Sequence, residues 1–352
     1  MAQPKPMRKR VIYYGWGVRD TMFVRKHWRE MERMPFDGTG IVVAIDRKAW
    51  LEGDTSTGNR LNWHIFGPKA FKLGDFREAI FDLKAARWRR FTENFIPASI
   101  CSKGQDFGFD WFDEERWRVV LNNWKILVTI AKEGRCRGVI VDPEHYGAHF
   151  FNYAEMRKRA PKSFPEYAAK VRERGRQLME ETRCIFPGMV LLFLFGPSVV
   201  ALWPKPLEKH AYGLLPAFID GMLLGSDEGT IIVDGCEVSY GFKERRQFLE
   251  VYHAVLGKAL RFTSVPRLYR AKVRVGFGLW LDCRWSRKGW DIRDFGKNFF
   301  TPEEFERSLR TALEISDGYV WIYSQTPRFF PVEKLPKPYL DALRRARETP
   351  PS

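Results

Sequence analysis

The stretch GVIVDPEHYG, residues 138–147, joins a short apolar run to a group of polar side chains. An unbroken run of β-branched residues is typical of a parallel strand that is buried on both faces. Successive side chains of a strand point to opposite faces, so Asp142 and Glu144 share one face. The stretch therefore predicts a buried strand whose carboxyl end carries two acidic groups that point the same way.

Seven further stretches have the composition of strands, and amphipathic segments separate them along the chain. The other predicted strands are VIYYGWG (11–17), GIVVAID (40–46), 90–100, 189–196, 230–240, 274–285 and 318–327. The predicted helices cover 20–34, 75–88, 111–134, 155–183, 212–225, 243–260, 301–316 and 335–348. Eight strands that are each followed by a helix predict an α/β fold, a (β/α)8 TIM barrel. A doubly wound open sheet uses the same alternation, but no glycine fingerprint follows the first strand.

Several helix ends are marked by residues that satisfy free backbone groups. Asp20 stands where an N-cap is expected, and Gly134 is a suitable stop for the helix before it. Thr301, Pro302 and Glu304 form the pattern of a capping box with proline at the first helical position. The sequence contains no repeat and no linker, which predicts one barrel domain over 1–352 with loop insertions near 47–70 and 283–300.

The chain is strongly basic, with 59 Lys and Arg against 43 Asp and Glu and a formal charge of +16. Such a charge favours anionic partners and says nothing about the fold. We predict no nucleic-acid partner, because the sequence has no helix-turn-helix, zinc-finger spacing or aromatic RNA-binding strand. An anionic polysaccharide and a solvated basic surface explain the charge equally well.

The five cysteines are scattered and include no CxxC pair, which is typical of a reduced protein with buried thiols. The opening has no apolar core of a signal peptide, and no apolar run approaches the length of a membrane span. We therefore expect a cytoplasmic protein without a membrane partner. A secreted protein whose leader has been removed is the alternative. The sequence gives no indication of oligomeric state.

Barrel enzymes build their sites from the loops at the carboxyl ends of the strands, and here those ends carry acidic and aromatic side chains. The candidates are Tyr14 and Trp16 after the first strand, Asp142, Glu144, His145 and Tyr146 after the fourth, Asp234 and Glu237 after the sixth, Trp280 and Asp282 on the seventh, and Trp321 and Tyr323 on the eighth. Two carboxyl groups together with flat apolar rings are what glycosidic cleavage requires.

The acidic candidates divide into a proton donor and a second carboxylate. Two carboxyl groups as close as Asp142 and Glu144 do not both ionise easily, so one keeps its proton near neutral pH. We expect Glu144 to donate that proton and Asp142 to tune its pKa. Glu237 or Asp234 supplies the second carboxylate, and their separation from Glu144 decides between a retaining and an inverting reaction.

Metal chemistry is the competing enzyme class. His145 and His149 are four residues apart, a spacing that binds zinc when both lie on one helix. Gly147 lies between them directly after a strand, where helical geometry is not assured. The first predicted strand also lacks the His-x-His of metal-dependent barrel hydrolases. We therefore predict neither a metal nor a cofactor.

The stretch GVIVDPEHYG also resembles the strand-four D-x-E-Y motif of chitinase-type barrels, glycoside hydrolase family 18. The resemblance implies Glu144 as proton donor, Asp142 as the residue that orients the substrate, and Trp321 as the floor of the sugar site. The longer acidic motif of that family is absent, since Ile140 stands where one earlier aspartate would be, and Pro143 replaces the usual aromatic residue. The stretches YYGWG (13–17) and IVDGCEVSYGF (232–242) also resemble uncharacterised barrel proteins that are assigned only to glycosidases.

Together these observations predict a glycoside hydrolase that cleaves an oligo- or polysaccharide by carboxylate acid/base catalysis. Trp16, Trp280, Trp321 and Tyr323 are expected to form the walls that contact sugar. A carbohydrate-binding barrel without catalysis is the first alternative, since it needs the aromatic rim but not Glu144. A metal-dependent barrel hydrolase is the second.

Overall fold

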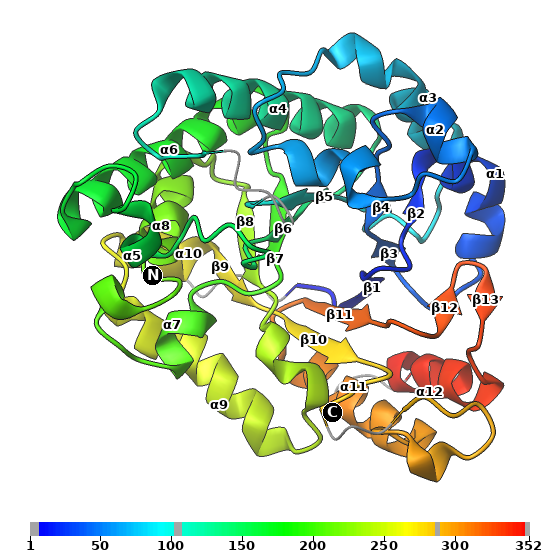
Figure 1. The fold of residues 1–352 in the computed structure, drawn as a ribbon. Coiled ribbons are helices and arrows are strands. Elements are labelled where there is room, and N and C mark those ends of the chain that lie inside the picture. Colours follow the sequence, from blue (N-terminus) through cyan, green and yellow to red (C-terminus); the bar gives the residue numbers. More distant parts are fainter. Residues whose placement is uncertain (1–6, 102–107, 286–288, 349–352) are drawn as a thin grey trace.

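The computed structural model describes residues 7–101, 108–285 and 289–348. Eight parallel strands form a ring, and Figure 1 shows the helices around its outside. In chain order the barrel strands are β1 (Arg10–Tyr13), β3 (Gly38–Thr39) continued by β4 (Ile41–Val42), β5 (Phe95–Ser99), β6 (Gly138–Asp142), β7 (Val190–Phe193), β8 (Ile231–Asp234), β9 (Val273–Val275) continued by β10 (Phe277–Trp280), and β11 (Tyr319–Tyr323). All eight predicted strands are present, and the predicted (β/α)8 barrel is confirmed.

The strand order closes the sheet on itself. Strand β1 pairs in parallel with β11 on one side and with β3 on the other. A bridge from Gly40 to Phe95 joins the second strand to β5, and β5 to β9 follow one another in order. Gly276 separates β9 from β10, and β10 then pairs with β11. Ring closure brings all the strand carboxyl ends to one mouth, which is what positions a site there.

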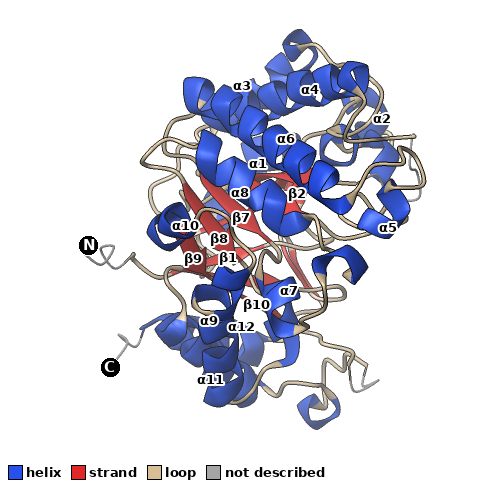
Figure 2. Ribbon diagram, turned by 90° about the vertical axis from the view of Figure 1, so that its left-hand side faces the viewer, coloured by secondary structure: helices blue, strands red, loops and turns tan. Residues whose placement is uncertain are grey.

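The helices enclose the strands, as Figure 2 shows from the side. They are α1 (Thr21–Met31), α2 (Arg47–Leu51), α3 (Arg77–Ala85), α4 (Glu114–Glu133), α5 (Tyr153–Met156), α6 (Phe164–Ile185), α7 (Ser198–Leu202), α8 (Leu215–Gly225), α9 (Arg245–Leu256), α10 (Pro266–Lys272), α11 (Pro302–Ile315) and α12 (Lys337–Glu348). The short strand β2 (Arg19–Asp20) pairs in parallel with β4, and β12 (Arg328–Phe329) and β13 (Val332–Glu333) form a separate two-stranded sheet. Strand residues such as Val139, Ile140 and Val141 are completely buried, as their apolar run predicts.

The predicted helix ends agree with the structure. Asp20 caps α1 by accepting hydrogen bonds from the backbone N–H groups of Met22 and Phe23. Thr301 and Glu304 form the capping box of α11, and Gly134 is the C-cap of α4. The backbone groups left free at each helix end are therefore satisfied locally, where the sequence placed the capping residues.

One predicted helix is wrong as a continuous element. The pattern over 155–183 predicts a single helix, but the structure has α5 and α6 with a break between them. Pro161 lies in the break and has no N–H to donate, and Ser163 starts α6 with a capping box to Glu166. The apolar spacing continues across both helices, so periodicity alone did not reveal the break.

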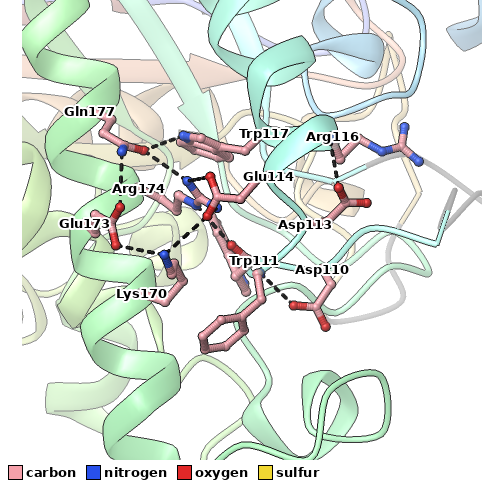
Figure 3. A network of polar contacts seen from close by, with 11 residues as sticks. Asp110, Trp111, Asp113, Glu114, Arg116, Trp117, Lys170, Glu173, Arg174 and Gln177 are labelled. Atoms are coloured by element: carbon pink, nitrogen blue, oxygen red, sulfur yellow. Dashed lines mark hydrogen bonds and ion pairs between the residues drawn. The ribbon is translucent and has the colours of Figure 1, made fainter.

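Arg174 in the middle of α6 is completely buried. Figure 3 shows its side chain reaching from α6 to the start of α4. Its Nη2 lies 2.7 Å from Glu114 Oε1, and its Nε donates to the Trp111 carbonyl oxygen at 3.0 Å. The guanidinium also lies 4.9 Å from the centroid of the Trp117 ring. The buried cation thus has a carboxylate, a carbonyl oxygen and an aromatic ring as partners, as burial of a charge requires.

The predicted insertion near 47–70 contains α2 and two short 3-10 helices, η1 (Thr57–Asn59) and η2 (Leu61–His64). The one near 283–300 contains η7 (Phe295–Lys297), and its residues 286–288 lie outside the described part of the chain.

Within the part of the chain that the structure describes, no helix combines the length and apolar character needed to cross a bilayer.

Candidate active site

A cavity of about 290 Å³ opens at the carboxyl ends of the barrel strands. Nine of the residues singled out from the sequence line it: Tyr14, Trp16, Asp142, Glu144, Tyr146, Glu237, Trp280, Trp321 and Tyr323. The other side chains discussed below that line it are Arg60, Asn62, Trp63, Tyr240 and Gln325. These residues come from most of the strand ends around the ring, so only closure of the barrel brings them together.

Three carboxyl groups converge on this cavity. Asp142 is the last residue of β6, and Glu144 follows two residues later in the loop. The carboxylate of Asp142 accepts hydrogen bonds from the backbone N–H of Glu144 and from the Tyr146 hydroxyl, both at 3.0 Å. These contacts hold the turn so that Asp142 and Glu144 both face the cavity.

Glu237 reaches the cavity by a route that differs from the predicted one. The predicted strand 230–240 is too long, because β8 ends at Asp234 and a 3-10 helix, η5 (Glu237–Gly241), follows. Cys236 has the left-handed backbone conformation, with a φ of 44°, and so turns the chain between the two elements. This turn, and not strand alternation, directs Glu237 to the same cavity as Asp142 and Glu144.

Burial raises the pKa of two of these carboxyl groups. The pKa of Asp142 is raised to about 7, first because burial removes water from its charged form and also because Glu144 lies nearby. The pKa of Glu237 is raised to about 8 by burial and by the charges of Glu144 and Asp142, against a hydrogen bond with Tyr240. Each group therefore keeps its proton at a pH where an exposed carboxyl is ionised.

Trp321 is one of the residues that line the cavity. Its side chain is 0% exposed, and its indole Nε1–H donates to the Gly235 carbonyl oxygen at 2.8 Å. A Cβ at Gly278 on the neighbouring strand would lie only 2.7 Å from the indole ring. The Trp321 ring therefore requires glycine at position 278. In the same way the Tyr14 ring requires glycine at position 40, where a Cβ would lie 2.4 Å from it.

A second group of rings forms one wall of the cavity. Tyr240 on η5 stacks on Tyr323 with centroids 5.4 Å apart and meets the Trp280 ring at 5.7 Å and the Trp321 ring at 5.2 Å. Burial raises the pKa of Tyr323 to about 12, so its hydroxyl stays protonated and donates or accepts as a neutral group. Tyr240 was missed in the sequence because the predicted strand hid the turn that carries it.

Another wall comes from the first strand end and from the insertion near 47–70. Trp16 and Trp63 have nearly parallel rings, 12° apart in angle and 6.3 Å between centroids. Trp63 also meets the edge of Tyr146 at 4.8 Å. Trp16 is 37% exposed and lines the cavity. Sequence reasoning missed Trp63, although its Arg60-Leu61-Asn62-Trp63 context lies in the insertion expected above the barrel mouth.

Three of the predicted site residues lie outside the cavity lining. Asp234 is 0% exposed, and its carboxylate is enclosed by hydrogen bonds from two loops. Asp282 accepts from Trp280 Nε1 and from the backbone N–H groups of Gln325 and Thr326, so it holds the loop after β11. His145 stacks on Tyr212 with centroids 4.0 Å apart, and burial lowers its pKa to about 3. For these residues the contacts support structural roles.

The histidine pair does not form a chelating arrangement. The His145 and His149 rings lie side by side, with centroids 4.5 Å apart and planes 30° apart. Across residues 7–101, 108–285 and 289–348, no group of three His, Cys, Asp or Glu side chains is placed to hold a metal ion.

Comparison with known proteins identifies the fold but assigns the chain to no sequence family. No protein-family model matches the chain, and no curated protein matches its sequence. A GH5-4 broad-specificity endoglucanase from an uncultured bacterium is 11% identical, with 95% of this chain and 86% of that chain covered and a TM-score of 0.51. The glycoside hydrolase 5 lichenase from Caldicellulosiruptor sp. F32, in complex with cellotetraose, is 10% identical, with 99% and 98% covered and a TM-score of 0.51.

A GH18 chitinase from Pseudoalteromonas aurantia is also similar, at 11% identity, with 96% of this chain and 100% of that chain covered and a TM-score of 0.45. The matches to the endoglucanase and the lichenase extend over nearly the whole chain, and they show that it has the barrel fold of these two glycoside hydrolases.

Proposed function

We propose that this protein is a glycoside hydrolase that cleaves an oligo- or polysaccharide, with Glu144 and Glu237 as its two reacting carboxyl groups. One observation carries the proposal: three carboxyl groups and a set of aromatic rings line a single cavity at the carboxyl end of the barrel. Glycosidic cleavage needs an acid, a second carboxylate and a surface against which the sugar ring is held. The barrel fold shared with glycoside hydrolases agrees with this use.

The buried carboxyl groups favour a division of roles that differs from the expectation drawn from the sequence. Glu237, whose pKa is raised to about 8, holds a proton at neutral pH and is suited to protonate the leaving oxygen. Glu144 then acts as nucleophile or as the base that activates water. Asp142 accepts a hydrogen bond from the Glu144 backbone and acts as a positioning residue, since it fixes the turn that carries Glu144.

The first experiment is a reducing-sugar assay over a broad glycan panel with wild type, Glu144→Gln and Glu237→Gln. Glutamine keeps the shape of glutamate but neither donates a proton as an acid nor attacks as a carboxylate. Both variants should lose about 100-fold or more of kcat/KM on any glycan that wild type cleaves. Glu208→Gln, which changes an exposed carboxylate outside the cavity, is the matched control and should retain full activity.

The two roles are separated with aryl glycosides that have a good leaving group and with added azide. Glu237→Gln should recover activity on such aryl glycosides, because their leaving group needs no protonation. If the reaction is retaining, Glu144→Gly should recover with azide, because the truncated side chain leaves space for an anion that replaces the missing nucleophile. Recovery of the Glu144 variant on aryl glycosides, and of the Glu237 variant with azide, would instead identify Glu144 as the proton donor. Binding of a glycan without turnover by wild type, on every substrate of the panel, would contradict the hydrolase proposal and favour a carbohydrate-binding barrel.

A further inference from the structure

Arg60 is the one cation among the described residues that line the cavity. It lies in the insertion near 47–70, where residues 59–61 run antiparallel to the end of the second strand. Ala44 and Arg60 form a bridge, and backbone hydrogen bonds join Leu61 to Val43 and Ile45 to Asn59. This small ladder fixes the Arg60 backbone at the barrel mouth.

The Arg60 side chain is also held, but only in part. Its Nε donates to the Thr55 carbonyl oxygen at 3.0 Å, and its guanidinium carbon lies 5.6 Å from the centroid of the Trp50 ring. No carboxylate among the described residues forms an ion pair with it, unlike Arg174, which pairs with Glu114. Burial lowers the pKa of Arg60 because its charged form loses water, so the cation is partly desolvated without an anion beside it.

A partly buried cation without a counter-ion is costly, and a ligand that supplies the anion removes that cost. The planar guanidinium matches carboxylate and sulfate oxygens, because its N–H groups can donate two parallel hydrogen bonds. Nε is engaged with Thr55, so the terminal nitrogens remain for such a ligand.

Asn62, two residues further along the same segment, provides a second and independent observation. It is 6% exposed and lines the cavity, and its Nδ2 lies 3.2 Å from Ser99 Oγ while its Oδ1 has no hydrogen-bond partner. If the amide is turned the other way, the nitrogen is the atom left without a partner. A sugar hydroxyl satisfies either atom, because it both donates and accepts.

We infer that the substrate is an acidic glycan, whose carboxylate or sulfate group pairs with Arg60 while a neighbouring hydroxyl bonds to Asn62. The inference rests on the proposed function only for the assumption that the cavity holds a saccharide. The formal charge of +16 also favours encounter with a polyanion.

The test measures binding by calorimetry, without turnover, to acidic tetrasaccharides and their neutral counterparts. The probes are tetragalacturonate, an alginate tetramer and a hyaluronan tetrasaccharide, each also in carboxyl-reduced form, and a chondroitin sulfate tetrasaccharide with and without its sulfate. Wild type should bind at least one acidic probe about tenfold or more tightly than its neutral counterpart. The carboxylate and sulfate arms show which anion Arg60 selects.

Arg60→Met should remove this preference and leave the affinity for neutral probes unchanged, and Arg60→Lys should restore part of it. Lys48→Met removes an exposed charge from the same segment, outside the cavity, and should keep the preference. Thermal unfolding of each variant checks that the barrel is folded. The inference is wrong if no acidic probe binds more tightly than its neutral counterpart, or if the preference persists in Arg60→Met.

The two proposals fail in different ways. Selective binding through Arg60 without hydrolysis of any glycan would contradict the proposed hydrolase activity and support the inference that the ligand is acidic. Hydrolysis of neutral glycans only, without preferential binding of acidic probes, would support the hydrolase proposal and contradict the inference of an acidic substrate.

Discussion

Asp142 and Asp234 are each the last residue of a barrel strand, β6 and β8, and both are nearly or completely buried. Each is followed within three residues by a glutamate that lines the cavity. Their surroundings differ. Asp234 accepts from the Gly196 N–H at 2.9 Å, the Ser198 N–H and hydroxyl at 2.8 Å, and the Cys236 N–H at 3.1 Å.

Among the described residues, Asp142 has only two such donors, the Glu144 N–H and the Tyr146 hydroxyl, and it lines the cavity with two further carboxyl groups. The same side chain at the same place in a strand therefore does different things. Asp234 joins the loop after β7 to the turn before η5, whereas Asp142 keeps a titratable group at the cavity with a pKa of about 7. Neighbouring donors, and not residue type, separate a structural carboxylate from one available to chemistry.

The largest effect that tests this comparison is expected from Asp234→Ala. Removing the carboxylate leaves four buried donors without an acceptor, which should lower the free energy of unfolding by about 3–5 kcal/mol. Urea unfolding followed by fluorescence measures this loss. Asp142→Ala, which leaves two donors, is the matched variant and should cost less. Equal losses of unfolding free energy from the two substitutions would contradict the view that Asp234 has the more structural role.

A smaller effect is expected on activity from Asp142→Asn. The amide can still accept from the Glu144 N–H but cannot share a proton with the acidic pair, so kcat/KM should fall by about 100-fold, or roughly 2.7 kcal/mol. Kinetics on a glycan that wild type cleaves would measure it, together with the pH profile, which should change shape because one titrating group is gone. An unchanged profile would show that Asp142 acts only through the fold.

A third effect concerns the dependence of stability on pH. The pKa of Asp142 is raised on folding from its ordinary value of 3.8 to about 7, so the folded state holds this proton more tightly than the unfolded state. The stability that the group contributes is fully present below pH 3.8 and is lost as the pH rises to about 7. Asparagine at position 142 does not titrate, so the Asp142→Asn variant should not lose stability in this way as the pH rises.

Between pH 4 and pH 8, Asp142→Asn should therefore gain up to about 4 kcal/mol of stability relative to wild type. Urea unfolding at the two pH values gives the difference. A gap between variant and wild type that stays constant with pH would contradict the raised pKa.

Part of the site followed from local pattern. Strand alternation correctly predicted that Asp142 and Glu144 face the cavity. The positions of Trp280, Trp321 and Tyr323 near strand ends correctly predicted that they line it. Alternation failed for Glu237, because the left-handed turn at Cys236 ends the strand first. Asp282 and His145 were predicted to bind substrate, but neither lines the cavity, since their partners come from loops that are distant in sequence.

The sequence by itself determined the eight strands, the helices between them and therefore the barrel, because apolar periodicity and capping residues act over a few neighbours along the chain. Only the tertiary structure decided which acidic side chains meet. Donors that enclose Asp234, the burial that raises the pKa of Glu237, and the placement of Arg60 and Asn62 beside the strand ends all arise between segments far apart in the chain. Charge and solvation depend on those distant neighbours, and no local pattern contains them.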